Sequence, residues 1–511
     1  MVEQWVWLLP VLPLLAAVWV GVGLLLGWNR GEAGERETAL VSSLATGLAL
    51  AGMLWVDITA LLAGAAPGSL RFFPWMETVG YRVMVSVTLD TLGMAMATLA
   101  ALLAFLTTRF SIHYLHREAG FQRFFALLNL FVAGLLQLLL AGNAVLAFVG
   151  WELMGLTSYL LIGYALDRET ATRNATRVFV TNRVGDAGFT VGILLSYTWL
   201  GGAEWSDLVG GSGLLNSFQL GVLSGGFLLA ALVKSAQFPF AAWIGRALEG
   251  PTPSSAIFYG SLMIHAGVYL LLRLEHLIAQ SPFLLVLLVL LGGCTVLYGV
   301  LVGLVQTDVK SGLISATQTQ VGIMVLTCGL GRFDLATWHL ALHAGWRAYQ
   351  FLSAPSYMHL LDGPTPPAWG GVQRREGLFA AALARFWLDP WTDLLLTRPT
   401  HSLARDVQSL DDRLVNRLLG NGSMERLLFG DAGLLRAEGG GQPSGVGLPG
   451  ALLAWVATRL QQMEDLILGM GGAGMTRTVA HLGGYLQRID LLFSEPRYLV
   501  LMILFTFFVI L

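Results

Sequence analysis

The sequence predicts an all-α integral membrane protein, a polytopic bundle of about 12 transmembrane helices. Of its 511 residues, 55% are hydrophobic and only 12% are charged, whereas soluble domains carry about 25% charged residues. Hydrophobic runs of about 20 residues, enough to cross a hydrocarbon core of about 30 Å, recur as far as residue 360. Unbroken runs such as Leu284 to Leu291 exclude a β-barrel, whose strands alternate in polarity. We therefore expect the helices to be surrounded by lipid.

The first run, Trp5 to Trp28, is expected to be a retained helix. It is too long for a cleaved signal, and Glu3 stands where such a signal carries positive charge. Ten further hydrophobic stretches follow. The expected helices lie near 5 to 27, 39 to 64, 84 to 108, 123 to 141, 143 to 166, 176 to 200, 219 to 245, 252 to 273, 282 to 304, 309 to 330 and 335 to 361.

Arginine is distributed unevenly over the short connections. The connections after the first, third and fifth helices hold eight arginines, and those after the second, fourth and sixth hold Arg71 and Arg82. Positive charge favours the cytoplasmic side, so the N-terminus is expected on the periplasmic side of a bacterial inner membrane.

The organisation changes beyond the helices. Residues 1–361 are expected to form the transmembrane bundle, and 362–450 a cytoplasmic, polar and partly helical segment ending in a glycine-rich linker. Residues 451–511 are expected to form amphipathic helices and a final span, with Tyr498 to Leu511 as its apolar part.

Lysine is confined to two positions. Of 30 Lys and Arg residues, only Lys234 and Lys310 are lysines, and a buried lysine can release a proton where arginine cannot. Lys234 lies in mid-span, where a charge usually reflects function, although a salt bridge for packing is the alternative. Lys310 begins a span, so a proton-transfer role and an interfacial anchor are equally compatible with it.

The span that holds Lys234 is expected to be broken. Pro239 follows five residues later and lacks a backbone donor, and the polar Gly250 to Pro253 comes soon after. Broken helices at membrane depth occur where they line a wet cavity or an ion site, although a packing kink is the alternative.

Two carboxylates lie inside spans. Glu152 is expected to pair with Lys234, which would lower the cost of burying both charges. Asp186 is a second candidate, but Arg183 precedes it by three residues on the same helix face and could simply neutralise it.

His339, His343 and Arg347 are spaced by four residues and share one helix face. Paired imidazoles inside a membrane suit a proton relay, with packing or metal binding as alternatives. No third ligand is evident, so no metal site is expected. His265 lies in another span and could join the relay or only bond a carbonyl.

Four motifs, GWELMGLTSYLLIGY, VKSAQFPFAAWIGRALEGPTPSSA, LVQTDVK and HLALHAGWRA, resemble the antiporter-like subunits of respiratory complex I, especially subunit L, and the Mrp-type antiporters. The resemblance implies an antiporter-like bundle with a broken helix near Lys234. It also implies proton translocation by changes in charge pairing along a central hydrophilic axis. The residues that match the family's functional positions are Glu152, Lys234, Lys310, His339 and His343.

The chain departs from the family pattern at three points. Arg347 stands where the family usually has a lysine, and arginine hardly releases a proton. Tyr259 stands where subunit L has a histidine, and His265 follows it as a substitute. The resemblance is continuous only to about Leu361, so the bundle is expected to be shorter than subunit L, with its outlet missing or supplied differently.

The shortened form and the motif WRAYQFLSAPS are similar to the membrane subunit of the two-component DAB inorganic-carbon accumulation complexes. That resemblance implies a large soluble partner with a zinc site like that of carbonic anhydrase, and flow of H+ or Na+ that drives CO2 hydration there. This chain would then be a transporter subunit and no enzyme by itself, with no cofactor of its own and no nucleic-acid partner. The alternatives are a proton-pumping subunit of a complex I or membrane hydrogenase type and a membrane anchor that only scaffolds its partner.

Overall fold

The computed structural model describes residues 5–78, 81–261, 263–354 and 375–419. The chain divides into two compact units, Met1–His401 and Ser402–Leu511. The expected linker and the expected final span lie outside the described residues.

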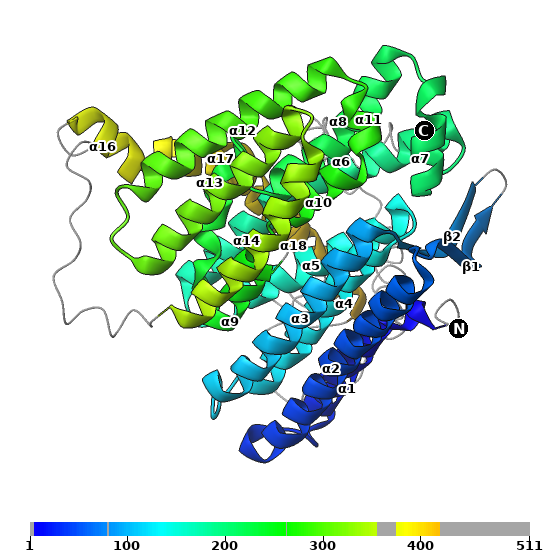
Figure 1. Cartoon of the computed structure of the whole chain (residues 1–511). Helices are drawn as coiled ribbons and strands as arrows, with labels where there is room; N and C mark the ends of the chain where they lie inside the picture. Colours follow the sequence, from blue (N-terminus) through cyan, green and yellow to red (C-terminus); the bar gives the residue numbers. More distant parts are fainter. Residues whose placement is uncertain (1–4, 79–80, 262, 355–374, 420–511) are drawn as a thin grey trace, which may run out of the picture. The chain divides into compact units, whose positions relative to one another are not determined.

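The first unit begins with helices that flank a short β-hairpin. Its elements up to the sixth helix are η2 (Val6–Leu8), α1 (Val11–Leu26), α2 (Gly31–Ala63), β1 (Gly68–Thr78), β2 (Tyr81–Leu89), α3 (Thr91–Tyr114), α4 (Phe121–Leu140), α5 (Ala144–Ile162) and α6 (Glu169–Leu200). In the bundle α1 packs on α2 and α4, and α4 packs on α5 (Figure 1).

The chain continues through shorter and more irregular elements. These are α7 (Trp205–Gly211), η3 (Ser212–Leu214), α8 (Ser217–Lys234), the 3-10 helix η4 (Phe240–Glu249), α9 (Thr252–Ser255), the π-helical turn η5 (Ala256–Ser261), α10 (Ala266–Arg273), α11 (Glu275–Ala279), α12 (Pro282–Gly303), α13 (Val309–Gly329) and α14 (Phe333–Ser353). After the gap come α16 (Glu376–Leu383), η7 (Arg385–Trp387), α17 (Leu388–Thr392), η8 (Asp393–Thr397) and α18 (Arg398–Leu419).

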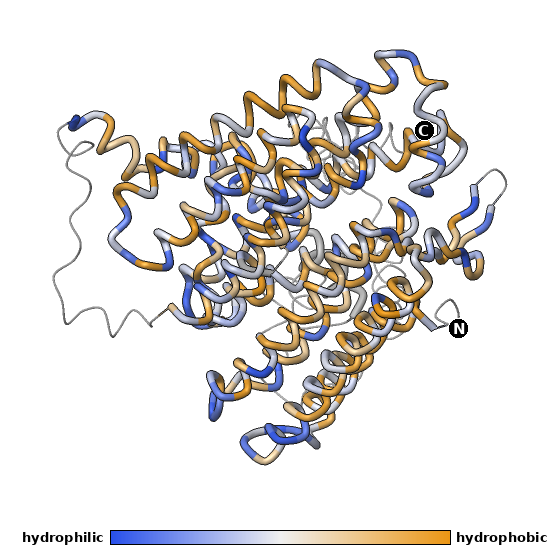
Figure 2. The backbone as a smooth tube through the Cα atoms, viewed as in Figure 1, coloured by the Kyte–Doolittle hydropathy of each residue, from blue (hydrophilic) through white to orange (hydrophobic). Residues whose placement is uncertain are grey.

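Eight helices of the described part are long and apolar enough to cross a membrane. They are Val6–Leu26, Gly31–Ala63, Thr91–Tyr114, Phe121–Leu140, Ala144–Ile162, Glu169–Leu200, Ser217–Lys234 and Pro282–Gly303. Helices α13 and α14 have 21 residues each and are not among these eight. Hydrophobic residues follow these helices along their length, and hydrophilic residues gather at the turns between them (Figure 2). The expected helical membrane fold is confirmed.

The hairpin was not expected from the sequence. The third helix is expected to include Met84 to Leu89, but these residues belong to strand β2, which pairs antiparallel with β1. The segment Val83 to Thr88 alternates valine with other residues, a pattern that suits a strand. Helix α3 begins only after Asp90, whose carboxylate accepts a hydrogen bond of 2.8 Å from the Gly93 amide and caps the helix.

The break near Lys234 is confirmed. Helix α8 ends at Lys234, and η4 begins after Pro239. The amide side chain of Gln318, on α13, donates to the carbonyls of Ala236 and Ala241 at 3.0 and 2.9 Å. Carbonyl groups freed by the break are thus satisfied by a neighbouring helix.

The helix expected over 252 to 273 is also interrupted. It is divided into α9, the π-helical turn η5 and α10, with His265 at the N-cap of α10. Single π-helical turns occur often at functional sites. Both interruptions lie on neighbouring parts of the bundle, since α10 packs on α8.

Candidate functional site

Five residues from α5, α6 and α8 form a group that we name the Lys234 cluster. Trp151, Asp186 and Lys234 are buried, and the side chains of Glu152 and Arg183 are 30% and 36% exposed. The Lys234 side chain is 1% exposed, and its Nζ lies 4.8 Å from the centre of the Trp151 ring. This is a cation–π contact, and among the described residues Nζ has no hydrogen-bond partner.

Arg183 holds both carboxylates of the Lys234 cluster. Its Nη1 lies 2.6 Å from Glu152 Oε2, and its Nη2 lies 2.7 Å from Asp186 Oδ2. The Trp151 indole donates to Asp186 Oδ1 at 2.7 Å. The expected direct Glu152–Lys234 ion pair is therefore not formed, because Arg183 occupies the carboxylate, and the alternative Arg183–Asp186 pair is present.

Gly155 has no side chain and so leaves space for the charged groups of Arg183 and Lys234. A Cβ atom at this position would lie 3.1 Å from Arg183 Nη2 and 3.7 Å from Lys234 Nζ. Sequence reasoning missed Gly155 and Trp151, since a glycine or tryptophan in an apolar helix carries no local sign of a charged neighbour.

A second group, which is buried, consists of His265 at the N-cap of α10 and of His343 and Arg347 on α14. We call His265 and His343 the histidine pair. His265 Nε2 and His343 Nδ1 are 2.8 Å apart, and Arg347 Nε and Nη2 lie 3.4 and 3.3 Å from His343 Nε2. A guanidinium only donates, so Nε2 of His343 accepts and its Nδ1 carries the hydrogen given to His265. His265 in turn carries its hydrogen on Nδ1, which has no partner among the described residues.

His339 lies beside the histidine pair without bonding to it. Its ring centre is 6.0 Å from that of His343, and its Nε2 lies 2.8 Å from Gln320 Oε1 on α13. The four-residue spacing placed both histidines on one helix face, as expected. Gln320 is a further polar partner that the sequence did not indicate.

Lys310 lies apart from both groups. Its Nζ donates to Thr252 Oγ1 at 2.7 Å, and Tyr114 OH lies 2.9 Å from the same oxygen. Thr252 begins α9, the segment that leads to His265. This contact anchors the interrupted segment, and a role in proton transfer stays a prediction.

The two groups are joined at their neighbouring residues. Ser235, which follows Lys234, donates its hydroxyl to the carbonyl of Ile264, which precedes His265, at 2.8 Å. Gly267 allows this approach, because a Cβ there would lie 2.1 Å from the carbonyl oxygen of Ala231. In the described part of the chain, no group of three or more His, Cys, Asp or Glu side chains could hold a metal ion.

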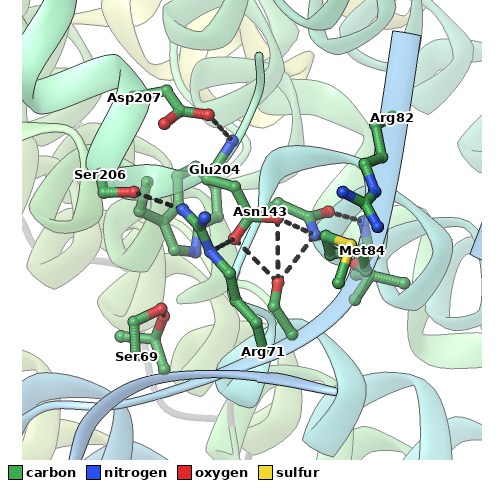
Figure 3. A network of polar contacts seen from close by, with 12 residues as sticks. Ser69, Arg71, Arg82, Met84, Asn143, Glu204, Ser206 and Asp207 are labelled. Atoms are coloured by element: carbon green, nitrogen blue, oxygen red, sulfur yellow. Dashed lines mark hydrogen bonds and ion pairs between the residues drawn. The ribbon is translucent and has the colours of Figure 1, made fainter. Parts of the chain in front are cut away.

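A third polar network lies at the end of the bundle that carries the hairpin (Figure 3). The Glu204 carboxylate accepts hydrogen bonds from Ser86 Oγ and Asn143 Nδ2, each at 3.0 Å, and Arg71 Nε lies 3.9 Å away. Asn143 also donates to the carbonyl of Met84 at 2.8 Å. The network ties strand β2 to the loops before α5 and α7. Burial raises the pKa of Glu204, although the hydrogen bonds from Ser86 and Asn143 act in the opposite direction.

We expect Glu204→Gln to flatten the pH dependence of thermal stability. An acid whose pKa rises on folding binds its proton more tightly in the folded state, so stability falls as pH rises above the unfolded pKa of about 4.3. Glutamine keeps an acceptor oxygen and cannot ionise. Glu204→Ala, the control, removes the acceptor and lowers stability by about 1 to 3 kcal/mol. Thermal unfolding in detergent between pH 5 and 7 is the measurement, and an unchanged slope in the glutamine variant would contradict the assignment.

Two family models match the chain. One, described as the transmembrane part of NADH:quinone oxidoreductase and Mrp antiporters, matches residues 141–362. The other, described as the N-terminus of complex I chain 5, matches residues 75–125. The first match contains every candidate site residue.

Two curated relatives give the degree of similarity. The chloroplastic NAD(P)H-quinone oxidoreductase subunit 5 of Zygnema circumcarinatum is 35% identical over 370 residues, which cover 71% of this chain and 52% of the relative. NADH-quinone oxidoreductase subunit L of Mycobacterium tuberculosis is 33% identical over 440 residues, which cover 85% of this chain and 67% of the relative. This chain thus spans about half the length of the chloroplast protein.

The fold is shared with a solved structure. A chain of the Mrp complex from Dietzia sp. DQ12-45-1b superposes with a TM-score of 0.59 at 21% identity, over 98% of this chain and 62% of that one. The identity to subunit L over two thirds of its length, together with the family models, shows that the chain belongs to the family of antiporter-like membrane subunits that includes complex I subunit L, chain 5 and the Mrp antiporters.

Proposed function

We propose that this chain carries protons through the membrane by way of the Lys234 cluster and the histidine pair, as one subunit of a larger membrane complex. The main support is the hydrogen bond that connects the two groups. Ser235, next to Lys234, donates to the carbonyl of Ile264, next to His265. Ionisable residues inside a membrane are costly and mark ion pathways.

The Lys234 cluster is balanced in charge. With Lys234 protonated, two cations face the carboxylates of Glu152 and Asp186, and the sum is zero. When Lys234 gives up its proton, the cluster carries one negative charge. Protonation and deprotonation of Lys234 thus change the electric field in the cluster without any movement of the helices. Arg183 stays between the two carboxylates in both states.

The histidine pair can pass one proton at a time. His343 takes a proton on Nε2 once Arg347 moves aside, and it gives its Nδ1 proton to His265 Nε2. His265 then releases its own Nδ1 proton. One proton enters, one leaves, and both rings must return to their first tautomers before the next transfer. The same steps run in either direction.

The ion that this chemistry favours is H+ rather than Na+. Hard cations prefer oxygen ligands, whereas the central atoms here are nitrogen bases of Lys234, His265 and His343. Arg347 positions His343 and does not exchange its own proton.

The finer proposal is that proton flow energises accumulation of CO2 or bicarbonate by a soluble zinc partner resembling carbonic anhydrase. Its support is the resemblance of the motif WRAYQFLSAPS, which begins within α14. The other candidate is a proton-pumping subunit of a redox complex, which the names of the quinone oxidoreductase relatives favour.

The test is growth of a carbonic-anhydrase-deficient bacterium at ambient CO2 with this gene and the gene of the zinc partner. We expect rescue by the wild type and loss of rescue by Lys234→Ala and by Glu152→Gln, each checked for insertion into the membrane. Arg173→Gln is the matched control, since Arg173 forms an exposed ion pair with Glu169 on α6.

The other outcomes separate the alternatives. Rescue by all variants would sink the proton path and favour a membrane anchor that only scaffolds its partner. Failure of the wild type to rescue would reject carbon accumulation and leave the redox complex.

A further inference from the structure

A large cavity lies at the end of the bundle that carries the hairpin. Its volume is about 740 Å³, and binding sites for small molecules have about 300 to 1,000 Å³. Its walls come from the hairpin, α3, α7, α10, α11 and α14, and most of the lining surface is apolar. The hairpin, α7 and α11 lie at the same end of the bundle (Figure 1). A cavity of this kind suits a molecule that combines an apolar part with a few polar groups.

Polar and apolar residues of the wall follow one another along α3. The wall begins with Asp90, which caps this helix, and with Thr91, and it continues with Leu92, Ala95 and Met96. A helix that starts at the membrane surface has its first residues at the level of the headgroups and its next turns at the level of the acyl chains. This part of the wall therefore matches a molecule with a polar head and an apolar tail.

Helix α14 shows the same order. Asp334 and Thr337, near its start, are followed in the wall by Trp338 and Ala341. Trp338 is 69% exposed, so its ring is available to cover an acyl chain. Because α14 packs on α3, we group the apolar residues of both helices as the apolar strip, which consists of Leu92, Ala95, Met96, Trp338 and Ala341.

Three carboxylates stand at the polar end of the cavity. The side chains of Asp90, Glu275 and Asp334 are 43%, 45% and 65% exposed, so each can accept further hydrogen bonds. Arg273 pairs with Asp90, and Arg332 pairs with Asp334. Among the described residues Glu275 has no arginine partner and lies 3.9 Å from a histidine. The polar end thus has one excess negative charge when that histidine is neutral, and this favours a headgroup that carries an ammonium.

Hydrogen-bond donors accompany these carboxylates. His276 on α11 and Ser206 on α7 line the cavity, and Arg71 Nη2 donates to Ser206 Oγ at 3.4 Å (Figure 3). The side chains of His276 and Arg71 are 66% and 54% exposed. Phosphate oxygens accept hydrogen bonds from such groups. The cavity therefore offers acceptors for an ammonium and donors for a phosphate, which are the two charged groups of a zwitterionic phospholipid.

We propose that this cavity binds one molecule of phosphatidylethanolamine. Its ammonium lies among Asp90, Glu275 and Asp334, its phosphate lies beside Ser206 and His276, and one acyl chain follows the apolar strip. Phosphatidylglycerol lacks the ammonium and meets the excess negative charge, so the site discriminates against it. This inference does not rest on the proposed proton path.

Native mass spectrometry of the full chain tests the site. The protein is equilibrated in detergent with equal amounts of phosphatidylethanolamine and phosphatidylglycerol that have identical acyl chains. We expect the wild type to retain one phospholipid with about a fivefold preference for phosphatidylethanolamine, because each exposed charge pair contributes little. Equal retention of the two lipids would show ordinary contact with lipid only and would overturn the inference.

Two variants separate the headgroup from the acyl chain. Glu275→Gln with Asp334→Asn reverses the sign of the excess charge, so we expect the preference to be lost. Its matched control is Glu77→Gln, which removes an exposed hairpin carboxylate outside the cavity wall and should keep the preference. Ala341→Phe fills the apolar strip and should lose the retained lipid, whereas Val286→Phe, at a position 58% exposed on α12, should keep it.

A preference that persists without Glu275 and Asp334 would overturn the inference. Retention of the lipid by Ala341→Phe, to the degree seen in Val286→Phe, would overturn it as well. Thermal unfolding in detergent checks that each variant is folded. Should Ala341→Phe unfold, Ala95→Leu fills the strip from α3 at an exposed position and replaces it in the comparison.

Discussion

We expect Lys234→Met to abolish proton flux and to destabilise the protein, and we expect the additional change Asp186→Asn to restore the stability but not the flux. Methionine has a similar length and is apolar, so it fits the site against the Trp151 ring. It cannot bind a proton, however, and general acid–base groups contribute about 10² to 10⁴-fold to the rates that depend on them.

The loss of stability follows from the charge balance of the Lys234 cluster. Without Lys234, Arg183 alone faces two carboxylates, and one negative charge is uncompensated. Removing one member of a fully buried charge group costs about 3 kcal/mol, and the cost is lower here because the Glu152 and Arg183 side chains are 30% and 36% exposed. Asp186→Asn returns the sum to zero and keeps an oxygen to accept the Trp151 hydrogen bond.

Flux is measured with a pH-sensitive dye in vesicles under an imposed proton gradient, and stability by thermal unfolding in detergent. If the double variant regained flux together with stability, Lys234 would be a structural charge and the proposed path would be wrong. If Lys234→Met were as stable as the wild type, the charge balance of the cluster would be rejected.

Local signals explain why much of this fold could be predicted. Pro239 lacks a backbone donor, so the end of α8 near Lys234 was visible in the sequence. The spacing of His343 and Arg347 by four residues likewise fixed their common helix face. The hairpin was missed because Met84 to Leu89 are hydrophobic enough to extend the run of α3, and only the cap at Asp90 separates the two.

Contacts between distant segments could not be predicted. His265 and His343 are 78 positions apart, and nothing in either segment indicates that their rings touch. The same holds for Arg183, whose neighbour Asp186 was evident while its bond to Glu152, from another helix, was not. Sequence patterns give the type of residue a site contains, whereas tertiary packing decides which of them meet.

His265→Gln, His343→Gln and the double variant should lose the same amount of flux, about 10²-fold each. The two rings act in series in the proposed path, so a path interrupted at one ring gains no further defect from the second. Glutamine at position 343 keeps an oxygen for Arg347 and an amide donor for His265, which preserves the hydrogen bonds. A loss of flux without a loss of stability would therefore report on proton transfer.

His339→Gln and His113→Gln are the control variants for this prediction. His339 bonds to Gln320 and not to the pair, so we expect a smaller effect, and His113 is exposed on α3 and should have none. Flux in vesicles and thermal unfolding are again the measurements. Multiplying losses in the double variant would contradict a direct transfer between the two rings, because the effects of independent residues multiply whereas those of residues that act as one unit do not. Equal losses would place them on one path, with the proton crossing the 2.8 Å between His343 Nδ1 and His265 Nε2.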